Sequence, residues 1–280
     1  MKFVYVILHY KTEEDTAACV RSIFASDSES EVVIVDNCSG NGSMEKVEET
    51  FSGMPRVHFL RNEENLGFAA GNNRGYAYAR DVLHADFIAV SNNDIVVDTG
   101  QFPARVLELY DREPFHVMGP DIVSAVDGGH QNPAEESFRT AFQVRKEILR
   151  YRFLLFLSRS GIYDLVKKNR AVRTGSSKRE IPETVTDSVM LHGSFVVFSK
   201  DFVSREQTCF REGTFLYVEE AILKRYCDSR GYRTVFDPSL RVRHKEDSAT
   251  QALRLTNRER REFVYRNMIR SLSVYLEYFR

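Results

Sequence analysis

Phe3-Val-Tyr-Val-Ile-Leu8 is the stretch that decides the fold of this 280-residue chain, because an unbroken apolar run is followed at once by polar residues. Such a run predicts a strand that is buried on both faces, as in a parallel sheet covered by helices. Thr12 is then expected to cap a helix, and the acidic residues after it suit the positive end of a helix dipole. We therefore predict an α/β sheet that starts with a strand at 3–8 and a helix over about 12–26.

The alternation of strand and helix continues along the chain to residue 91. The pattern predicts strands at 32–35, 57–60 and 86–91, and helices over about 43–51 and 68–82. Three strands end in polar clusters, namely His9-Tyr10-Lys11, Asp36-Asn37 and Asn92-Asn93-Asp94. Ligands of open α/β sheets bind beyond the carboxyl ends of the strands. We therefore expect these three clusters to meet at one binding site.

A basic segment interrupts this rhythm. From Arg139 to Glu180 there are twelve Lys and Arg against three acidic residues, so the segment carries +9 and the rest of the chain −10. We expect residues 138–168 to be mostly helical, with apolar and aromatic residues on one side and Arg and Lys on the other. Such a helix can lie in the interface of an anionic membrane. The alternatives are a lid or an oligomer contact that faces the acidic body.

The α/β pattern then resumes. It predicts a strand-like stretch at 189–198, a helix at 219–230, a strand at 233–236 and an amphipathic helix at 257–280. We divide the chain into a nucleotide-binding half, a basic insert, a second half of the same domain and a C-terminal helix, at 1–125, 126–187, 188–256 and 257–280.

Composition narrows the class of protein. With 42% hydrophobic and 28% charged residues, the chain is globular rather than disordered or collagen-like. The longest apolar runs are far shorter than the roughly 20 residues that span a bilayer, and no signal-peptide pattern is present. The four cysteines are scattered, which favours thiols in a reducing cytosol. No RNA-binding motif accompanies the basic segment, so nucleic acid is not an expected partner.

Six motifs, taken in order, resemble those of family 2 glycosyltransferases with the GT-A fold, and in particular the rhamnosyltransferases of O-antigen and capsule synthesis. The resemblance covers most of the chain apart from the basic insert. Any one motif would be weak, whereas all six in order are specific. They are Tyr5-Val-Ile-Leu-His-Tyr10, Val33-Ile-Val-Asp-Asn-Cys-Ser39, Asn65-Leu-Gly-Phe-Ala-Ala-Gly-Asn-Asn-Arg-Gly75, Ser91-Asn-Asn-Asp94, Phe215-Leu-Tyr-Val-Glu-Glu220, and Asp237-Pro238 with Val242-Arg-His244.

The resemblance implies a fold of two halves, one Rossmann-like for the nucleotide and one for the acceptor. It also implies a metal site at Asp94, to which His244 contributes. A hard cation such as Mg²⁺ or Mn²⁺ prefers carboxylate and phosphate oxygens, and it would neutralise a departing diphosphate. Asn92 stands where the family's first acidic residue would be, so the cation would have one carboxylate rather than two. The alternative for Asp94 is a solvated turn, and a lone histidine is more often packed or on the surface.

The donor is expected to bind along the first half of the sheet. Asp36 can accept a hydrogen bond from a pyrimidine N–H or a ribose hydroxyl, although it could also cap a turn. The small residues of 65–75 would let the backbone approach the donor closely, or simply start a helix. The expected donor-binding residues are His9, Tyr10, Asp36, Asn65, Gly67, Phe68, Gly71, Asn72, Asn92 and Asn93.

The acceptor hydroxyl requires a general base. By the family's acidic pair this base is Glu220, with Glu219 as the fallback. The alternative is that both acids only complement the helix dipole. Gly193 lies where the family's acceptor loop passes the sugar, and His192 and Ser194 are weaker acceptor-binding candidates.

One-step displacement predicts an inverting transferase. The resemblance implies a UDP- or dTDP-sugar as donor and a saccharide or lipid-linked saccharide as acceptor. We expect a cytoplasmic protein that can attach to the inner face of the membrane. A sugar-phosphate nucleotidyltransferase would need a glycine-rich loop after the first strand, which His9-Tyr-Lys-Thr12 does not provide. A processive synthase would carry a Trp-containing motif, and the chain has no Trp. An inactive protein that only binds carbohydrate or nucleotide remains the other alternative.

Overall fold

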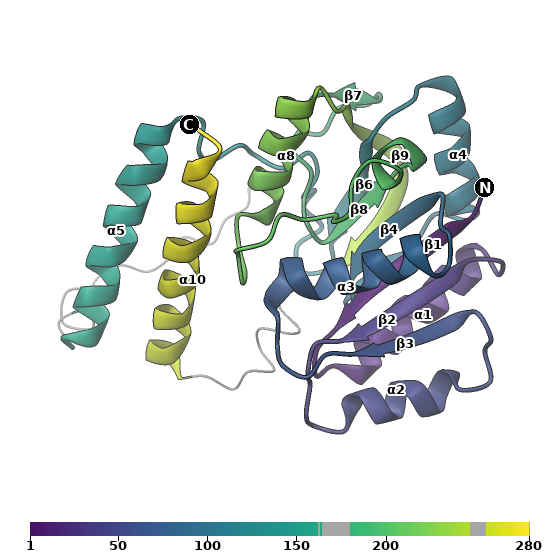
Figure 1. The fold of residues 1–280 in the computed structure, drawn as a ribbon, viewed down its shortest axis with the longest axis horizontal. Helices are drawn as coiled ribbons and strands as arrows, with labels where there is room; N and C mark the ends of the chain where they lie inside the picture. Colours follow the sequence, from purple (N-terminus) through teal and green to yellow (C-terminus); the bar gives the residue numbers. More distant parts are fainter. Residues whose placement is uncertain (162, 164–179, 247–255, 280) are drawn as a thin grey trace.

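The computed structural model describes residues 1–161, 163, 180–246 and 256–279. Within these residues the strands form one nine-stranded sheet with helices on both faces (Figure 1). Eight of them follow the order β3-β2-β1-β4-β8-β6-β9-β5, and β7 pairs with β9. The strands are β1 (Phe3–His9), β2 (Glu31–Asp36), β3 (Val57–Arg61), β4 (Phe87–Asn92), β5 (Ile95–Val97), β6 (Val117–Ser124), β7 (Thr186–Asp187), β8 (Phe195–Phe198) and β9 (Thr234–His244).

The first half of the sheet is parallel. β1 lies between β2 and β4, and its register places His9 opposite Asp36 and Leu8 opposite Asn92. The carboxyl ends of these strands therefore lie at one edge of the sheet, as the strand-end pattern predicts. β1 and β2 are buried along nearly their whole length, which explains their unbroken apolar sequence.

The second half is mixed, and it continues the same sheet. β8 runs antiparallel to both β4 and β6, and β6 runs parallel to β9. The expected strand at 189–198 is wrong in its first part, because β8 begins only at Phe195 and the preceding residues form a loop. The expected strand at 233–236 is too short, since β9 runs on through Pro238 to His244.

Helices cover the two faces of the sheet with two apolar cores. α1 (Glu13–Ser26), α2 (Ser43–Phe51) and α4 (Phe102–Arg112) pack on one face. α3 (Gly67–Asp81), α7 (Lys200–Val203) and α8 (Glu219–Arg230) pack on the other. Thr12 is the N-cap residue of α1, but its side chain makes no capping hydrogen bond. Its hydroxyl instead accepts a hydrogen bond of 2.7 Å from the Asn93 amide, which ties α1 to the loop after β4.

α3 packs against the sheet with two glycines on the side that faces it. A Cβ on Gly71 would lie 2.7 Å from Leu8 Cδ1, and a Cβ on Gly75 would overlap Val6 and Val35. Glycine is therefore needed at these positions for helix–sheet packing. The glycines of 65–75 thus serve the fold at 71 and 75, rather than an approach to a ligand.

α5 (Ala141–Arg159) and α10 (Asn257–Glu277) lie side by side and pack with α8 in a third apolar cluster (Figure 1). A capping box between Thr140 and Gln143 starts α5. The expected helix at 138–168 is confirmed over α5, which ends at Arg159, while 162 and 164–168 lie outside the described residues. Among the described helices, none has both the length and the apolarity needed to cross a bilayer.

Candidate active site

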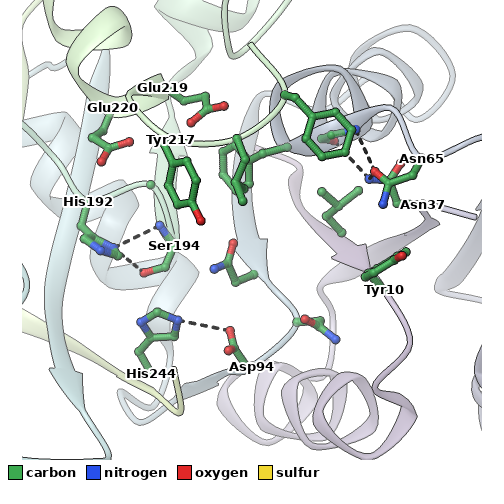
Figure 2. A pocket seen from close by; sticks show the side chains of 18 of the residues that line it. Tyr10, Asn37, Asn65, Asp94, His192, Ser194, Tyr217, Glu219, Glu220 and His244 are labelled. Atoms are coloured by element: carbon green, nitrogen blue, oxygen red, sulfur yellow. Dashed lines mark hydrogen bonds and ion pairs between the residues drawn. The ribbon is translucent and has the colours of Figure 1, made fainter. Parts of the chain in front are cut away.

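A pocket of about 560 Å³ opens beyond the carboxyl ends of β1, β2 and β4 (Figure 2). Its walls come from both halves of the sheet, from the loop before β8, from the N-terminus of α8 and from α10. The structure brings together at this pocket most of the residues that the sequence singles out. They are Tyr10, Asn65, Gly67, Phe68, Asn92, Asn93, Asp94, His192, Gly193, Glu219, Glu220 and His244.

Two adjacent carboxylates, Glu219 and Glu220, line the pocket from the first turn of α8. Burial raises the pKa of Glu219 to about 8, with a further contribution from the negative charge of Glu220. Burial also raises the pKa of Glu220. A carboxyl group whose pKa lies close to neutrality is suited to accept and release protons at physiological pH.

The backbone that presents this pair is strained. Tyr217 and Val218 have φ values of 74° and 72°, in the left-handed region that a β-branched residue such as Val rarely adopts. Strain of this kind costs on the order of 1–3 kcal/mol and clusters at functional sites. It turns the chain sharply into α8, so that Glu219 and Glu220 both line the pocket instead of facing solvent.

Asp94 and His244 form a second pair, on the other side of the pocket from the two glutamates in Figure 2. Asp94 follows β4 and His244 ends β9, and both side chains are buried. His244 Nε2 lies 3.3 Å from Asp94 Oδ1, and that oxygen has no hydrogen-bond partner among the described residues. A buried carboxylate oxygen without a donor is a position where a cation is favourable.

The spacing of this pair fits a divalent cation. Neighbouring ligands of an octahedral ion with bonds of about 2.1 Å lie about 3 Å apart, close to the 3.3 Å between His244 Nε2 and Asp94 Oδ1. No group of three or more His, Cys, Asp and Glu side chains suited to a metal occurs within the described residues. Such an ion would therefore need further oxygen ligands from a bound diphosphate and from water.

His192 and Gly193 lie in the loop before β8. The Ser194 amide N–H donates to His192 Nδ1 over 3.3 Å, so the neutral ring carries its proton on Nε2. Burial, together with the nearby His244, lowers the pKa of His192 to about 4, which keeps the ring uncharged at neutral pH. A Cβ on Gly193 would lie 3.7 Å from Phe68 and 3.9 Å from Glu220 Oε2, so the glycine leaves space beside the candidate base.

Asn37 forms hydrogen bonds that hold the pocket wall at the end of β2. The sequence predicts its neighbour Asp36, and not Asn37, as a donor contact. The Asn37 amide donates to Asn65 Oδ1 and to the Gly67 carbonyl, and its Oδ1 accepts from the Leu66 N–H. These bonds hold the loop before α3 against the end of β2. The polar cluster Asp36-Asn37 was the available signal, but the sequence did not distinguish which side chain faces the pocket.

Four predicted donor-binding residues, His9, Asp36, Gly71 and Asn72, are not part of the described pocket lining. The buried His9 ring bonds to Thr16 and Ser43 through its two nitrogens, so its side chain faces α1 and α2. Asp36 accepts from both the N–H and the hydroxyl of Ser39, as in the turn-capping alternative. Gly71 contacts Leu8, and the Asn72 amide donates to the Phe68 carbonyl within α3. The geometry thus gives all four residues structural contacts.

The pocket also contains residues that were not predicted as contacts. Phe215, Leu216 and Tyr217 belong to a stretch already noted for its motif, whereas Ser194, also in the lining, was a weaker acceptor-binding candidate. Phe263 comes from α10, more than 40 residues beyond the acidic pair, and only the packing of α10 brings it to the site. The remaining unpredicted residues are Leu8 and Asn37.

The family model described as glycosyl transferase family 2 matches residues 5–179. The chain belongs to glycosyl transferase family 2. This assignment agrees with the motifs that the pocket brings together, and it confirms the family resemblance seen in the sequence. A comparison with curated proteins finds no match.

Solved structures of S. aureus TarS 1-349 share the fold of this family 2 protein. The complex with UDP has 14% identity and a TM-score of 0.53, over 87% of this chain and 60% of that chain. The complex with UDP-GlcNAc has 13% identity and a TM-score of 0.55, over 96% and 65%. The chain thus spans about two thirds or less of these two TarS chains. The likeness confirms the predicted GT-A fold, an α/β sheet flanked by helices, although the sheet was expected to be mostly parallel and its second half is mixed.

Proposed function

We propose that this protein transfers a sugar from a UDP- or dTDP-sugar to a hydroxyl group of a saccharide or lipid-linked saccharide, with inversion at the anomeric carbon. One observation carries the proposal: the raised-pKa carboxylates Glu219 and Glu220 and the buried pair Asp94 and His244 line one pocket. The pocket volume of about 560 Å³ lies within the range of ligand sites for molecules of this size.

The chemistry is a direct displacement. Glu220, as a carboxylate, accepts the proton of the acceptor hydroxyl while the hydroxyl oxygen forms a bond to the anomeric carbon. The bond from that carbon to the diphosphate oxygen breaks on the opposite side, and the nucleoside diphosphate leaves with the electron pair. Because one displacement occurs, the configuration inverts. Glu219 would hold a proton at neutral pH, which limits negative charge beside Glu220.

Asp94 and His244 would hold Mg²⁺ or Mn²⁺, and the bound ion would neutralise charge on the diphosphate. Asn92 and Asn93 line the pocket beside them and supply polar groups without adding negative charge. The single carboxylate suits a site that an anionic donor must also enter.

The nucleotide is proposed to bind along the wall formed by Tyr10, Asn37 and Asn65. Tyr10 offers an aromatic face for a base. The Asn65 oxygen already accepts from Asn37 and from the Gly67 N–H, so its NH₂ group is the donor that this wall offers to the base edge or the ribose. UDP bound to S. aureus TarS, whose fold this chain shares, supports a uridine nucleotide. A dTDP-sugar remains part of the proposal because thymine presents the same hydrogen-bonding edge as uracil.

Nucleotide release with a panel of donors tests this function. The purified protein is incubated with Mn²⁺, saccharide acceptors and UDP-glucose, UDP-galactose, UDP-N-acetylglucosamine or dTDP-rhamnose. A transferase releases a nucleoside diphosphate and adds one sugar mass to the acceptor, and NMR of the product reports inversion. Pyrophosphate release from a sugar phosphate and a nucleoside triphosphate would indicate a nucleotidyltransferase instead. Donor binding without turnover of any pair would indicate a binding protein.

The outer face of α5 supports peripheral attachment to a membrane, as expected of an enzyme that acts on a lipid-linked acceptor in surface polysaccharide synthesis. Phe142, Leu149, Phe153 and Phe156 are each at least 60% exposed. Their spacing of seven, four and three residues places them on one stripe of the helix. At about 100° per residue, basic side chains follow both edges of the stripe, namely Arg145 and Arg152 on one side and Lys146 and Arg150 on the other.

The distribution of side chains around α5 differs from the expected one, in which one side is apolar and the other is basic. The inner side of α5, including Val144 and Ile148, packs against α10 and α8, so the helix is apolar on two faces. The exposed stripe with basic edges matches a helix that lies flat in an anionic interface. α10, on which α5 packs, contributes Phe263 to the pocket, so attachment would hold the pocket beside the lipid surface.

Flotation with vesicles tests the attachment. We expect binding at low salt to vesicles that contain an anionic phospholipid, and weaker binding to neutral ones. Phe153→Ser with Phe156→Ser should abolish binding, and Val126→Ser, at an exposed apolar residue away from α5, should not. No binding by the unchanged protein would refute attachment, and a dimer that the Phe153/Phe156 variant disperses would assign the stripe to a second copy of the chain.

A further inference from the structure

A chain of hydrogen bonds connects Glu246, through Gln131, to His244 in the pocket wall. Gln131 Nε2 donates to Glu246 Oε1 over 2.9 Å, and Gln131 Oε1 lies 2.8 Å from His244 Nδ1. On its other edge, His244 presents Nε2 to Asp94 Oδ1 at 3.3 Å. Gln131 and Glu246 are not in the pocket lining, and the hydrogen bond to His244 connects them to the site.

The direction of each bond follows from what each group can donate. The Glu246 carboxylate only accepts, so the amide nitrogen of Gln131 must face it. The amide oxygen then faces His244, and an oxygen that accepts there requires a proton on Nδ1. In the neutral ring, Nε2 is therefore left with a lone pair that faces Asp94. Glu246 thus orients Gln131, and Gln131 selects the tautomer of His244.

This selection leaves two acceptors facing each other. A neutral His244 Nε2 and the Asp94 carboxylate would repel at 3.3 Å, and Asp94 Oδ1 has no donor among the described residues. A metal ion that both atoms bind resolves the conflict, whereas the other tautomer would place an N–H against Asp94 and block the nitrogen as a ligand. Histidine ligands are commonly held in this way by a hydrogen bond to the second ring nitrogen.

We infer that Gln131, oriented by Glu246, is a positioning residue that keeps the proton of His244 on Nδ1 and so leaves Nε2 available, with Asp94, for a divalent cation. The inference rests on the cation site of the proposed function. It assigns roles to two residues outside the motifs, one between β6 and α5 and one just after β9. Neither residue lines the pocket.

Two variants test the Gln131–His244 and Glu246–Gln131 hydrogen bonds separately. Gln131→Leu removes the acceptor for His244 Nδ1 and keeps a side chain of similar size. Glu246→Gln is nearly isosteric, but its amide can donate, so Gln131 is free to turn over and offer its own NH₂ to His244. The control is Gln207→Leu, at an exposed glutamine far along the chain.

The decisive measurement is the ¹⁵N NMR spectrum of histidine-labelled protein at mildly alkaline pH, before and after Mg²⁺ and UDP, with His244 assigned by its loss in His244→Gln. We expect Nδ1–H in the unchanged protein and an Nε2–H population in Gln131→Leu and Glu246→Gln. Mn²⁺ affinity, measured by electron paramagnetic resonance with UDP, should fall about 10- to 100-fold in Gln131→Leu and less in Glu246→Gln. Gln207→Leu should change neither.

The NMR spectrum and the Mn²⁺ affinity can each overturn the inference, on different grounds. A proton on Nε2 in the unchanged protein, or a tautomer that neither variant alters, would overturn the positioning role, whatever the enzyme transfers. A correct tautomer with wild-type Mn²⁺ affinity in both variants would also overturn it, because the role is to prepare the cation site. Absence of Mn²⁺ binding by the unchanged protein would remove the cation site, and with it this role, while leaving sugar transfer to be judged by nucleotide release.

Discussion

Glu219 and Glu220 are neighbours in the first turn of α8, yet both carboxyl groups line the same pocket. Consecutive residues on a helix usually face different directions, and here the pocket wraps around the helix end. Burial raises the pKa of both groups, and the charge of Glu220 adds to the shift of Glu219. The pair therefore holds fewer than two negative charges over part of the neutral range, as coupled carboxyl groups do.

Glu220→Gln should nearly abolish transfer and leave donor binding intact. The amide keeps the size of the side chain but cannot accept a proton from the acceptor hydroxyl, and general bases contribute about 10²- to 10⁴-fold to rate. Single-turnover transfer and UDP affinity would be measured together. Glu219→Gln is the matched control and should retain more activity. If the two variants lost activity in the reverse order, Glu219 would be the base.

Stability should depend on pH through Glu219. The folded-state pKa of about 8 lies above the usual 4.5, so the native state binds the proton more tightly than the unfolded state. This contribution is complete below about 4.5 and is lost as the pH rises to about 8. Glu219→Gln mimics the neutral acid and removes the loss.

Thermal unfolding at several pH values measures this effect. The melting temperature of Glu219→Gln relative to the unchanged protein should be higher at about pH 9 than at about pH 5. An equal difference at both pH values would mean that Glu219 is not protonated in the folded protein at neutral pH. Glu212→Gln, at an exposed carboxylate in the same region, is the control and should show no such trend.

Asp94→Ala should weaken UDP binding in the presence of Mn²⁺ by at least about tenfold, because it removes the one carboxylate of the proposed cation site. Binding without Mn²⁺ should change little. Calorimetric titration with UDP, with and without Mn²⁺, measures the difference. Asp98→Ala is the control, since Asp98 pairs with Arg243 outside the pocket. Equal Mn²⁺ dependence in Asp94→Ala and the unchanged protein would exclude Asp94 as a ligand.

The first half of the sheet could be predicted because its signals are local. Each buried strand is an apolar run, and each ends at polar residues whose position follows from parallel pairing. β6 carries no such signal, since Gly119 and Pro120 interrupt it and its register with β9 shifts between Pro120 and Asp121. Pairing with β8 and β9 overrides the low strand propensity of these residues, which a single sequence cannot show.

The site residues show the same contrast between local signals, which the sequence contains, and long-range contacts, which it does not reveal. Asp94, Glu219 and Glu220 belong to motifs, and the structure brings them to one pocket. Gln131 was not predicted, because its role depends on His244, 113 residues away, and on the direction of a hydrogen bond. His9 was predicted from its strand end, but the last residue of β1 faces α1 and α2, since successive side chains of a strand alternate between faces.

Gly193→Ala tests whether the acceptor sugar occupies the space beside Glu220. The added methyl group would lie 3.7 Å from Phe68 and 3.9 Å from Glu220 Oε2, which are ordinary contact distances, so the fold should tolerate it. The methyl group would nevertheless take up room between the base and the aromatic wall. We expect transfer to fall about tenfold or more, with a higher KM for the acceptor and little change in donor affinity.

Gly67→Ala provides the contrast that makes this result interpretable. Gly67 has a φ of +79°, and its Cβ would overlap the backbone of Phe215, whose carbonyl accepts a hydrogen bond of 2.7 Å from the Phe68 N–H. This substitution should therefore lower the melting temperature as well as the activity, whereas Gly193→Ala should lower the activity alone. Wild-type acceptor kinetics in Gly193→Ala would place the acceptor elsewhere in the pocket, because a sugar beside Glu220 cannot share its space with a new methyl group.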